Sequence, residues 1–218
     1  MTRAVTIALP KGRTLAAVRD IFARAGVTGS PTLDAALRED SRALVRRAEH
    51  AGHPLDLLLL KPDDVPTYVE YGTADLGICG RDVLSEREVD VYQPVDLGIG
   101  RCRLVVAGRS GALPEVTRMP RIATKYPRAA AQHFARSGVQ VEIVNVQSSV
   151  ELAPLTGLAD LIVDLVETGA TLAQNGLEVK EEIARVSTVL IANRAAYKLR
   201  ADVIVPLVSA VRGAVAVA

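Results

Sequence analysis

Tryptophan is absent from this chain of 218 residues, and aromatic residues together make up only 3% of it. A hydrophobic core must therefore be built from Val, Leu, Ile and Ala, within the 49% of residues that are apolar. Aliphatic side chains of this kind suit strands that are buried on both faces, as in parallel sheets. The length allows one large domain or two small ones, because a domain commonly has about 100–200 residues.

An excess of charge of either sign is also missing, since 26 basic and 25 acidic residues leave a formal net charge of +1. This balance argues against a nucleic-acid-binding domain, which usually carries a basic excess on one face. The two cysteines, Cys79 and Cys102, form neither a disulfide framework nor a metal motif. His50, His53 and His133 show no metal-ligand spacing. We expect reduced thiols and no metal site built by the protein itself.

Long apolar runs are lacking at both ends of the chain. The apolar run 4–9 is too short for the core of a secretory signal, and two cations follow it. The most apolar stretch, 203–218, contains Pro206 and Arg212 and is shorter than the ~20 residues of a membrane span. We therefore expect a soluble, cytoplasmic protein.

Short apolar runs alternate with helical spacing along the chain. The expected helices span about 15–25, 65–70, 127–136, 150–155, 171–175 and 195–212, the last bent or broken near Pro206. The expected strands span 4–9, 55–60, 74–79, 103–107, 121–124, 139–146, 160–166 and 186–192. This alternation predicts an α/β architecture with mainly parallel sheets.

The middle of the chain reads as a second α/β unit inserted into the first. We expect domain I to comprise residues 1–92 plus 184–218 and domain II to comprise 93–183, with hinges near Gln93–Pro94 and Glu181–Ala184. Ligands of such folds usually lie outside the carboxyl ends of strands, often between domains. The loops that follow strands are therefore the segments to search for chemistry.

The segment DLVETGATL (164–172) follows the apolar strand 160–166. Gly169 allows a positive φ and a close approach of the backbone to a ligand. Amides at the start of the following helix favour an anion, and the hydroxyls of Thr168 and Thr171 suit phosphate oxygens. Asp164 and Glu167 are acceptors suited to vicinal ribose hydroxyls. A plain capped strand–turn–helix remains the alternative on these residues alone.

Two further turns carry candidate ligand groups. Lys11 and Arg13 flank a glycine at the start of a helix, where cations oppose the helix dipole. They either hold an anion or are solvated surface cations. Asp75, in the segment ADLGICG (74–80), either bonds a ligand or caps a turn, and Glu151 either caps a helix or contacts a ligand.

The segment DLGIGRCR (96–103) has the glycine spacing of half a dinucleotide-binding fingerprint, and its arginines suit phosphate contacts. It precedes a strand, whereas the fingerprint follows a strand into a helix, so we reject a Rossmann interpretation.

Taken together, these segments resemble the ATP phosphoribosyltransferase family. The resemblance covers nearly the whole chain in order, and the combination is far more specific than any fragment. It rests on ALPKGRTL (8–15), DVPTYVEYGTADLGICGRDVL (64–84), VDLGIGRCRLVVA (95–107), RIATKYP (121–127), SSVELAPLTGLADLIVDLVETGATLAQNGL (148–177) and LIANR (190–194).

The resemblance implies a two-domain fold like that of type II periplasmic binding proteins, with the active cleft between the domains. It also implies that phosphoribosyl pyrophosphate and ATP react to give phosphoribosyl-ATP and pyrophosphate, the first step of L-histidine biosynthesis. The group is transferred to N1 of the adenine, and Mg²⁺ is bound to the diphosphate. We expect direct displacement without a protein nucleophile, so that the protein positions the substrates and stabilises charge.

The resemblance also assigns residues. The four catalytic residues are expected to act on pyrophosphate (Lys11 and Arg13) and on the ribose (Asp164 and Glu167). The 5-phosphate is expected to bind at Thr168, Gly169, Ala170 and Thr171. The nucleotide site is expected to involve Arg42, Asp75, Gly77, Cys102 and Glu151. The match around Arg42 is poor.

The family has a long form with a histidine-binding regulatory domain beyond the last helix. This chain ends at Ala218 and resembles the short form, which works with a regulatory subunit related to histidyl-tRNA synthetase. We expect that subunit as a partner and a homo-oligomer, in particular a dimer. Feedback by histidine on this chain alone is not expected.

Two rival interpretations stay open. A Rossmann-like phosphoribosyltransferase shares the Thr-Gly-x-Thr-Leu ending but carries two adjacent acids at the strand end, whereas here Leu165 follows Asp164 and the second acid is Glu167. A solute-binding protein with the same clam-shell fold would need export and would not need the phosphate turn.

Overall fold

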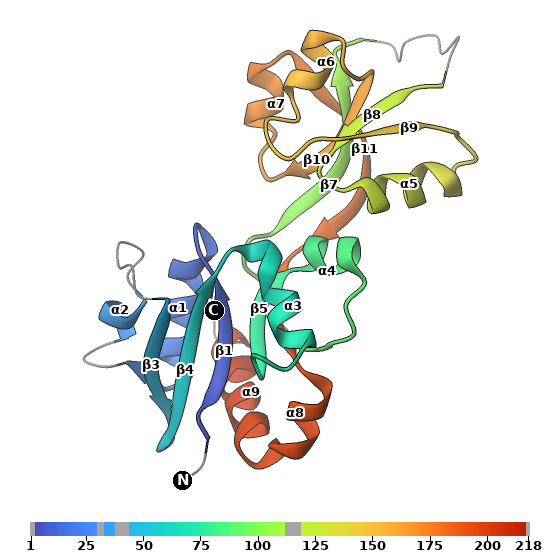
Figure 1. Cartoon of the computed structure of the whole chain (residues 1–218). Helices are drawn as coiled ribbons and strands as arrows, with labels where there is room; N and C mark the ends of the chain where they lie inside the picture. Colours follow the sequence, from blue (N-terminus) through green and yellow to red (C-terminus); the bar gives the residue numbers. More distant parts are fainter. Residues whose placement is uncertain (1–2, 30–32, 38–43, 112–118, 217–218) are drawn as a thin grey trace. The chain divides into compact units, whose positions relative to one another are not determined.

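The computed structural model describes residues 3–29, 33–37, 44–111 and 119–216, shown in Figure 1. The chain forms two compact units. The first unit comprises Met1–Gly100 with Ser187–Ala218, and the second comprises Arg101–Val186.

The first unit contains a seven-stranded mixed sheet with strand order β2-β3-β4-β1-β5-β12-β6. Strands β4, β1 and β5 run parallel to one another, and the remaining neighbours are antiparallel. The strands are β1 (Val5–Pro10), β2 (Val27–Gly29), β3 (Val45–His50), β4 (His53–Leu60), β5 (Leu76–Gly80), β6 (Tyr92–Asp96) and β12 (Thr188–Ala192).

Helices cover both faces of this sheet (Figure 1). On one face α1 (Thr14–Arg24) and α9 (Ala201–Ala216) form the larger core, and on the other lie α3 (Val65–Glu70) and α4 (Arg81–Arg87). Strand alternation produces both cores, since Ile7 and Leu9 of β1 face α1 and α9 whereas Ala8 faces α3. The short elements are α2 (Leu33–Ala36), the 3₁₀ turn η1 (Pro62–Asp64) and α8 (Arg194–Leu199).

The second unit contains a five-stranded mixed sheet with strand order β11-β7-β10-β8-β9. Strands β10, β8 and β9 are parallel, and β7 is antiparallel to both of its neighbours. Helices α6 (Leu152–Thr156) and α7 (Ala170–Gln174) pack on one face and α5 (Pro127–Arg136) on the other. The strands are β7 (Cys102–Arg109), β8 (Arg121–Thr124), β9 (Glu142–Asn145), β10 (Leu161–Val166) and β11 (Leu177–Val186).

The prediction of mainly parallel sheets was wrong, because four antiparallel strands, β2, β3, β6 and β11, were not recognised in the sequence. The two longest are β3, with the sequence VRRAEH, and β11, with the sequence LEVKEEIARV. Both are rich in charge because much of their surface faces solvent, which conceals the apolar pattern of a strand. Val186 accordingly ends β11 instead of beginning the strand predicted at 186–192.

The last helix also differs from its prediction. The helical segment breaks at Arg200, between α8 and α9, and Pro206 lies inside the continuous helix α9. None of the helices in the described part of the chain is both long and apolar enough to cross a membrane.

The boundaries between the compact units fall later than the predicted domain limits at 92/93 and 183/184. Residues 93–100 stay in the first unit because β6 pairs with β12 there. Residues 184–186 stay in the second because β11 pairs with β7 as far as Val186.

Candidate functional site

Polar and charged residues gather at one edge of the second unit's sheet. Strands β8, β9 and β10 are parallel, so their carboxyl ends share this edge. The segments that leave it are Lys125–Tyr126 after β8, residues 146–149 after β9 and residues 167–171 after β10. Open α/β sheets commonly bind ligands at such an edge.

The conformation of the loop 167–171 depends on Gly169. Gly169 has φ +84°, a left-handed conformation that favours glycine. The Thr168 hydroxyl accepts a hydrogen bond from the Ala170 amide at 3.3 Å, which closes the turn. Glu167, Thr168, Ala170 and Thr171 are exposed. Because α7 has only five residues, its dipole is small, and the hydroxyls of the exposed Thr168 and Thr171 are the groups that suit an anion.

Asp164 lies beside this loop, two residues before the end of β10. By strand alternation it shares a face with Ile162 and Val166, the face covered by α6 and α7. One carboxylate oxygen, Oδ1, accepts from the Leu165 amide at 2.8 Å. Burial raises the pKa of the Asp164 carboxyl and the nearby Glu151 carboxylate raises it further, whereas the Leu165 amide and Lys125 act to lower it.

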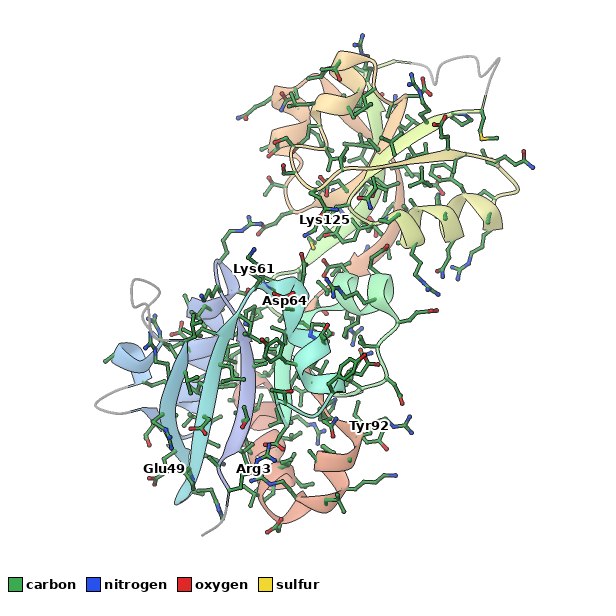
Figure 2. All side chains as sticks on the ribbon, viewed as in Figure 1. Arg3, Glu49, Lys61, Asp64, Tyr92 and Lys125 are labelled. Carbon is green, nitrogen blue, oxygen red and sulfur yellow. The ribbon has the colours of Figure 1, made fainter. Side chains whose placement is uncertain are left out.

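Lys125 is a candidate that sequence reasoning did not single out, and it is labelled in Figure 2. It follows Thr124, a fully buried residue whose hydroxyl donates to the Val163 carbonyl at 2.7 Å and accepts from the Tyr126 amide at 2.8 Å. Thr124 thus ties the end of β8 to β10 next to Asp164. The available sequence signal was a cation placed directly after an apolar strand.

The first unit presents exposed cations at the equivalent edge of its parallel strands. Lys11 and Arg13 follow β1, and Gly12 between them has φ +97°. The Lys11 amide donates to the Leu60 carbonyl at 2.8 Å, so this turn lies next to Lys61, which follows β4 and is labelled in Figure 2. Sequence reasoning found Lys11 and Arg13 but did not single out Lys61.

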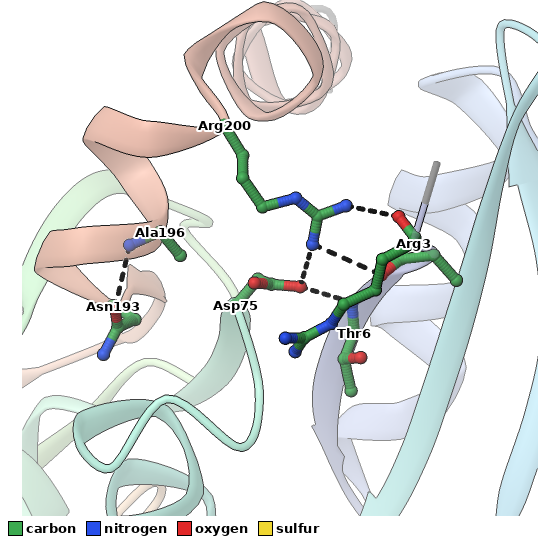
Figure 3. A network of polar contacts seen from close by, with 7 residues as sticks. Arg3, Thr6, Asp75, Asn193, Ala196 and Arg200 are labelled. Atoms are coloured by element: carbon green, nitrogen blue, oxygen red, sulfur yellow. Dashed lines mark hydrogen bonds and ion pairs between the residues drawn. The ribbon is translucent and has the colours of Figure 1, made fainter. Parts of the chain in front are cut away.

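Asp75 has a structural setting that does not favour its predicted nucleotide contact. It is 3% exposed, and it precedes β5, so it lies at the opposite edge from Lys11. Its Oδ2 accepts from the Thr6 amide at 2.8 Å and from Arg200 Nη1 at 2.7 Å (Figure 3). Arg200 also donates to the carbonyls of Arg3 and Ala4. The carboxylate therefore joins β1 and β5 to the C-terminal helices.

Gly77 also has a packing role. A Cβ atom there would lie 2.6 Å from Val69 Cγ2 and 2.9 Å from Val65 Cγ1, so the glycine lets α3 approach β5. Cys102 is half-buried at the first position of β7, and Glu151 is half-buried just before α6. Arg42 lies outside the residues that the structure describes.

Two α/β units, each with a mixed sheet between helical layers, define the class of the periplasmic-binding-protein-like type II fold. The periplasmic aliphatic sulphonate binding protein from Escherichia coli is similar with a TM-score of 0.59 over 99% of this chain and 74% of that chain. At 12% identity this likeness shows the fold alone.

The particular family follows from closer matches. The family model of ATP phosphoribosyltransferase matches residues 61–213, and the chain belongs to this family. It is 58% identical to the ATP phosphoribosyltransferase of Sorangium cellulosum (strain So ce56) over 216 residues, which is 99% of this chain and 98% of that protein.

A solved structure, the ATP phosphoribosyl transferase (HisG:HisZ) complex from Thermotoga maritima, contains a similar chain. The TM-score is 0.82 at 33% identity, with 98% of this chain and 100% of that chain covered. The family predicted from the sequence and the two-unit α/β fold are thus confirmed. The individual ligand contacts stay predictions.

Proposed function

We propose that this chain transfers the phosphoribosyl group of phosphoribosyl pyrophosphate to N1 of ATP, giving phosphoribosyl-ATP and pyrophosphate, the first step of L-histidine biosynthesis. Membership of the ATP phosphoribosyltransferase family supports this reaction. The observation that supports its location is the position of Asp164 beside the exposed glycine loop 167–171 at the carboxyl edge of β10.

The transfer is a direct displacement at C1 of the ribose. The adenine N1 forms a bond to C1 as the bond from C1 to the pyrophosphate oxygen breaks, and the bonding electrons leave with pyrophosphate. No protein nucleophile is required, so the protein acts by holding both substrates in line and by stabilising charge.

The second unit supplies the sugar-phosphate contacts in this proposal. The amides and hydroxyls of Thr168, Gly169, Ala170 and Thr171 hold the 5-phosphate, since they belong to a largely exposed turn around a left-handed glycine. Asp164 and Glu167 accept hydrogen bonds from the ribose hydroxyls and favour the positive charge that develops on the sugar.

The first unit supplies cations for the leaving group. Lys11 and Arg13 are exposed after β1, which fits them to attract pyrophosphate. Mg²⁺ prefers oxygen ligands and usually keeps substrate phosphates and waters around it. We therefore treat it as part of the substrate, bound to the diphosphate, where it neutralises negative charge.

We also propose that this chain binds a regulatory subunit of the kind named in the Thermotoga maritima complex. We further propose that the chain forms a homo-oligomer, as predicted from the sequence. The cytoplasmic location predicted from the sequence stays a prediction. Gel filtration of this chain with and without the candidate subunit measures both associations.

The direct test mixes the protein with ATP, phosphoribosyl pyrophosphate and Mg²⁺ and follows the absorbance of the adduct, with and without the regulatory subunit. Activity that needs all three components supports the proposal. Thermal stabilisation by an amino acid or an oxyanion, without turnover under any condition, would instead support a solute-binding protein of the same fold.

The loop assignment has its own test in the combined variant Gly169→Ala and Thr171→Ala. The left-handed φ of Gly169 disfavours a Cβ, and the second change removes a hydroxyl, so the phosphate cradle is altered twice. We expect the KM for phosphoribosyl pyrophosphate to rise far more than the KM for ATP. Equal increases for both substrates would contradict this assignment.

A further inference from the structure

Lys125 and Asp164 are brought side by side by the pairing of β8 with β10. The parallel register places Leu161, Ile162 and Val163 opposite residues 122–124. Asp164 and Lys125 are the next residues after the last of these pairs. Ile162 belongs to the core under α6 and α7, so alternation directs Asp164 to that same face. Lys125 is the first residue after the end of β8, and its charge acts on the Asp164 carboxyl.

The backbone on both sides of this pair is fixed by one buried hydroxyl. Thr124 is 0% exposed, and its Oγ1 bonds the Val163 carbonyl and the Tyr126 amide at 2.7 and 2.8 Å. Val163 immediately precedes Asp164, and Tyr126 immediately follows Lys125. The backbone positions of Lys125 and Asp164 are therefore set by the pairing of β8 with β10.

Charges of opposite sign approach Asp164 from different elements. Lys125 comes from the segment after β8, and Glu151 from the residue just before α6. On the other side, β7 places the uncharged Val105 opposite Asp164. Within the described residues, the Asp164 side chain accepts one hydrogen bond, which the Leu165 amide donates to Oδ1.

We propose that Lys125 is a positioning residue of the phosphoribosyl site, whose ammonium group keeps the Asp164 carboxylate ionised and oriented against the opposing charge of Glu151. The proposal rests on the proposed function for its meaning in catalysis. A carboxylate that must accept hydrogen bonds from two hydroxyls is useful only when ionised, because the protonated form has an O–H that donates. Lys125 preserves the acceptor form in a half-buried setting.

The first measurement needs no substrate. Carboxyl-¹³C NMR of aspartate-labelled protein follows the titration of Asp164, whose resonance is assigned by its loss in Asp164→Asn. We expect Lys125→Met to raise the titration midpoint by about one pH unit, because it removes a neighbouring opposite charge. Glu151→Gln is expected to lower it, and Lys125→Arg to keep it near the wild-type value.

The second measurement is the pH profile of kcat/KM for phosphoribosyl pyrophosphate. The acid limb of the profile of Lys125→Met should also move to higher pH by about one unit. At a given pH on that limb, kcat/KM should therefore fall roughly tenfold. Lys125→Arg should restore most of the wild-type profile. Lys198→Met, an exposed lysine of α8 in the first unit, is the matched control and should leave the profile unchanged.

An unchanged titration of Asp164 in Lys125→Met overturns the proposal, and so does a shift of the same sign in Glu151→Gln. Circular dichroism checks that the variants fold, and Lys125→Gln replaces the methionine variant if that one does not. If the midpoints shift as expected while the wild-type protein shows no turnover, the charge coupling stands and the proposed function fails.

Discussion

At the scale of a single residue, Asp164 is the proposed ribose contact, and its ionised form is disfavoured by the unliganded fold. Burial and Glu151 raise the pKa of its carboxyl, so ionised Asp164 is less favourable in the folded chain than in the unfolded one. Because a raised carboxyl pKa makes the folded state bind protons more tightly, this residue's destabilising effect is relieved as the pH falls through the folded pKa.

Asp164→Asn removes this charge with little change of shape. We expect the variant to have a higher Tm than the wild type near pH 7 and to lose stabilisation by phosphoribosyl pyrophosphate. Differential scanning fluorimetry with and without that ligand measures both effects. A lower Tm together with retained binding would show that Asp164 is a packing residue.

Arg200 is a residue whose predicted effect is on stability alone. It bonds Asp75 at 2.7 Å, and the two side chains are 21% and 4% exposed (Figure 3). Replacing it with Met leaves the buried Asp75 carboxylate without its charged partner, which costs about 3–5 kcal/mol. Urea unfolding monitored by circular dichroism should show this loss.

The matched control is Arg194→Met. Arg194 pairs with Asp90 at 2.7 Å, but both side chains are mostly exposed, and solvent screens such pairs so that they contribute little to stability. If the two arginine variants lost equal stability, burial of the Asp75–Arg200 pair would not be the reason for its effect.

At the scale of one element, the β3–β4 hairpin places two histidines opposite each other. His50 and His53 are paired across the turn formed by Ala51 and Gly52, which both have positive φ. Burial lowers the pKa of His50, and the nearby His53 lowers it further. The neutral form of His50 is therefore favoured by the fold.

The sign follows from proton linkage. A histidine with a lowered folded pKa contributes stability that is present above the unfolded pKa of about 6.5 and is lost as the pH falls. We expect His50 to contribute a decrease in the free energy of unfolding from pH 7 to pH 5, and His53→Gln to make this contribution smaller. Urea titrations at several pH values measure it, and an identical slope in the variant would exclude coupling of the two imidazoles.

Helix ends and strand charge decided which elements could be predicted. The helices Val65–Glu70 and Pro127–Arg136 have the predicted bounds, because a proline lies in the first turn and a left-handed glycine follows the last. Strand β11 was missed because five of its ten residues are charged, which conceals the apolar alternation of a strand.

At the scale of the whole molecule, binding should be visible as stabilisation. A ligand that binds only the folded state adds about 2.7 kcal/mol at a concentration 100 times its Kd. We expect phosphoribosyl pyrophosphate with Mg²⁺ to raise the Tm of the wild type, and ribose 5-phosphate to do so more weakly because it lacks the diphosphate for Lys11 and Arg13. Equal shifts would argue against the cationic turn as a diphosphate site.

The sequence by itself determined the family and the loop 164–172. The family is indicated by short segments in a fixed order along the chain. The signal of the loop is local: an apolar strand, a glycine that permits positive φ, and acids and threonines within eight residues of one another. Such neighbours along the chain stay neighbours in any fold. The family could therefore be inferred from the order of the residues alone, and the loop could be predicted as the site of the sugar phosphate.

Only the tertiary structure decided which distant residues meet. Lys125 follows β8 next to Asp164 because β8 and β10 pair in one register. Asp75 is bonded by Arg200, 125 residues along the chain, at the edge of the first unit's sheet opposite Lys11. A strand's register is set by burial of its whole face and by long-range hydrogen bonds, and a shift of one residue would turn every side chain to the other face. No short segment of the sequence contains that information.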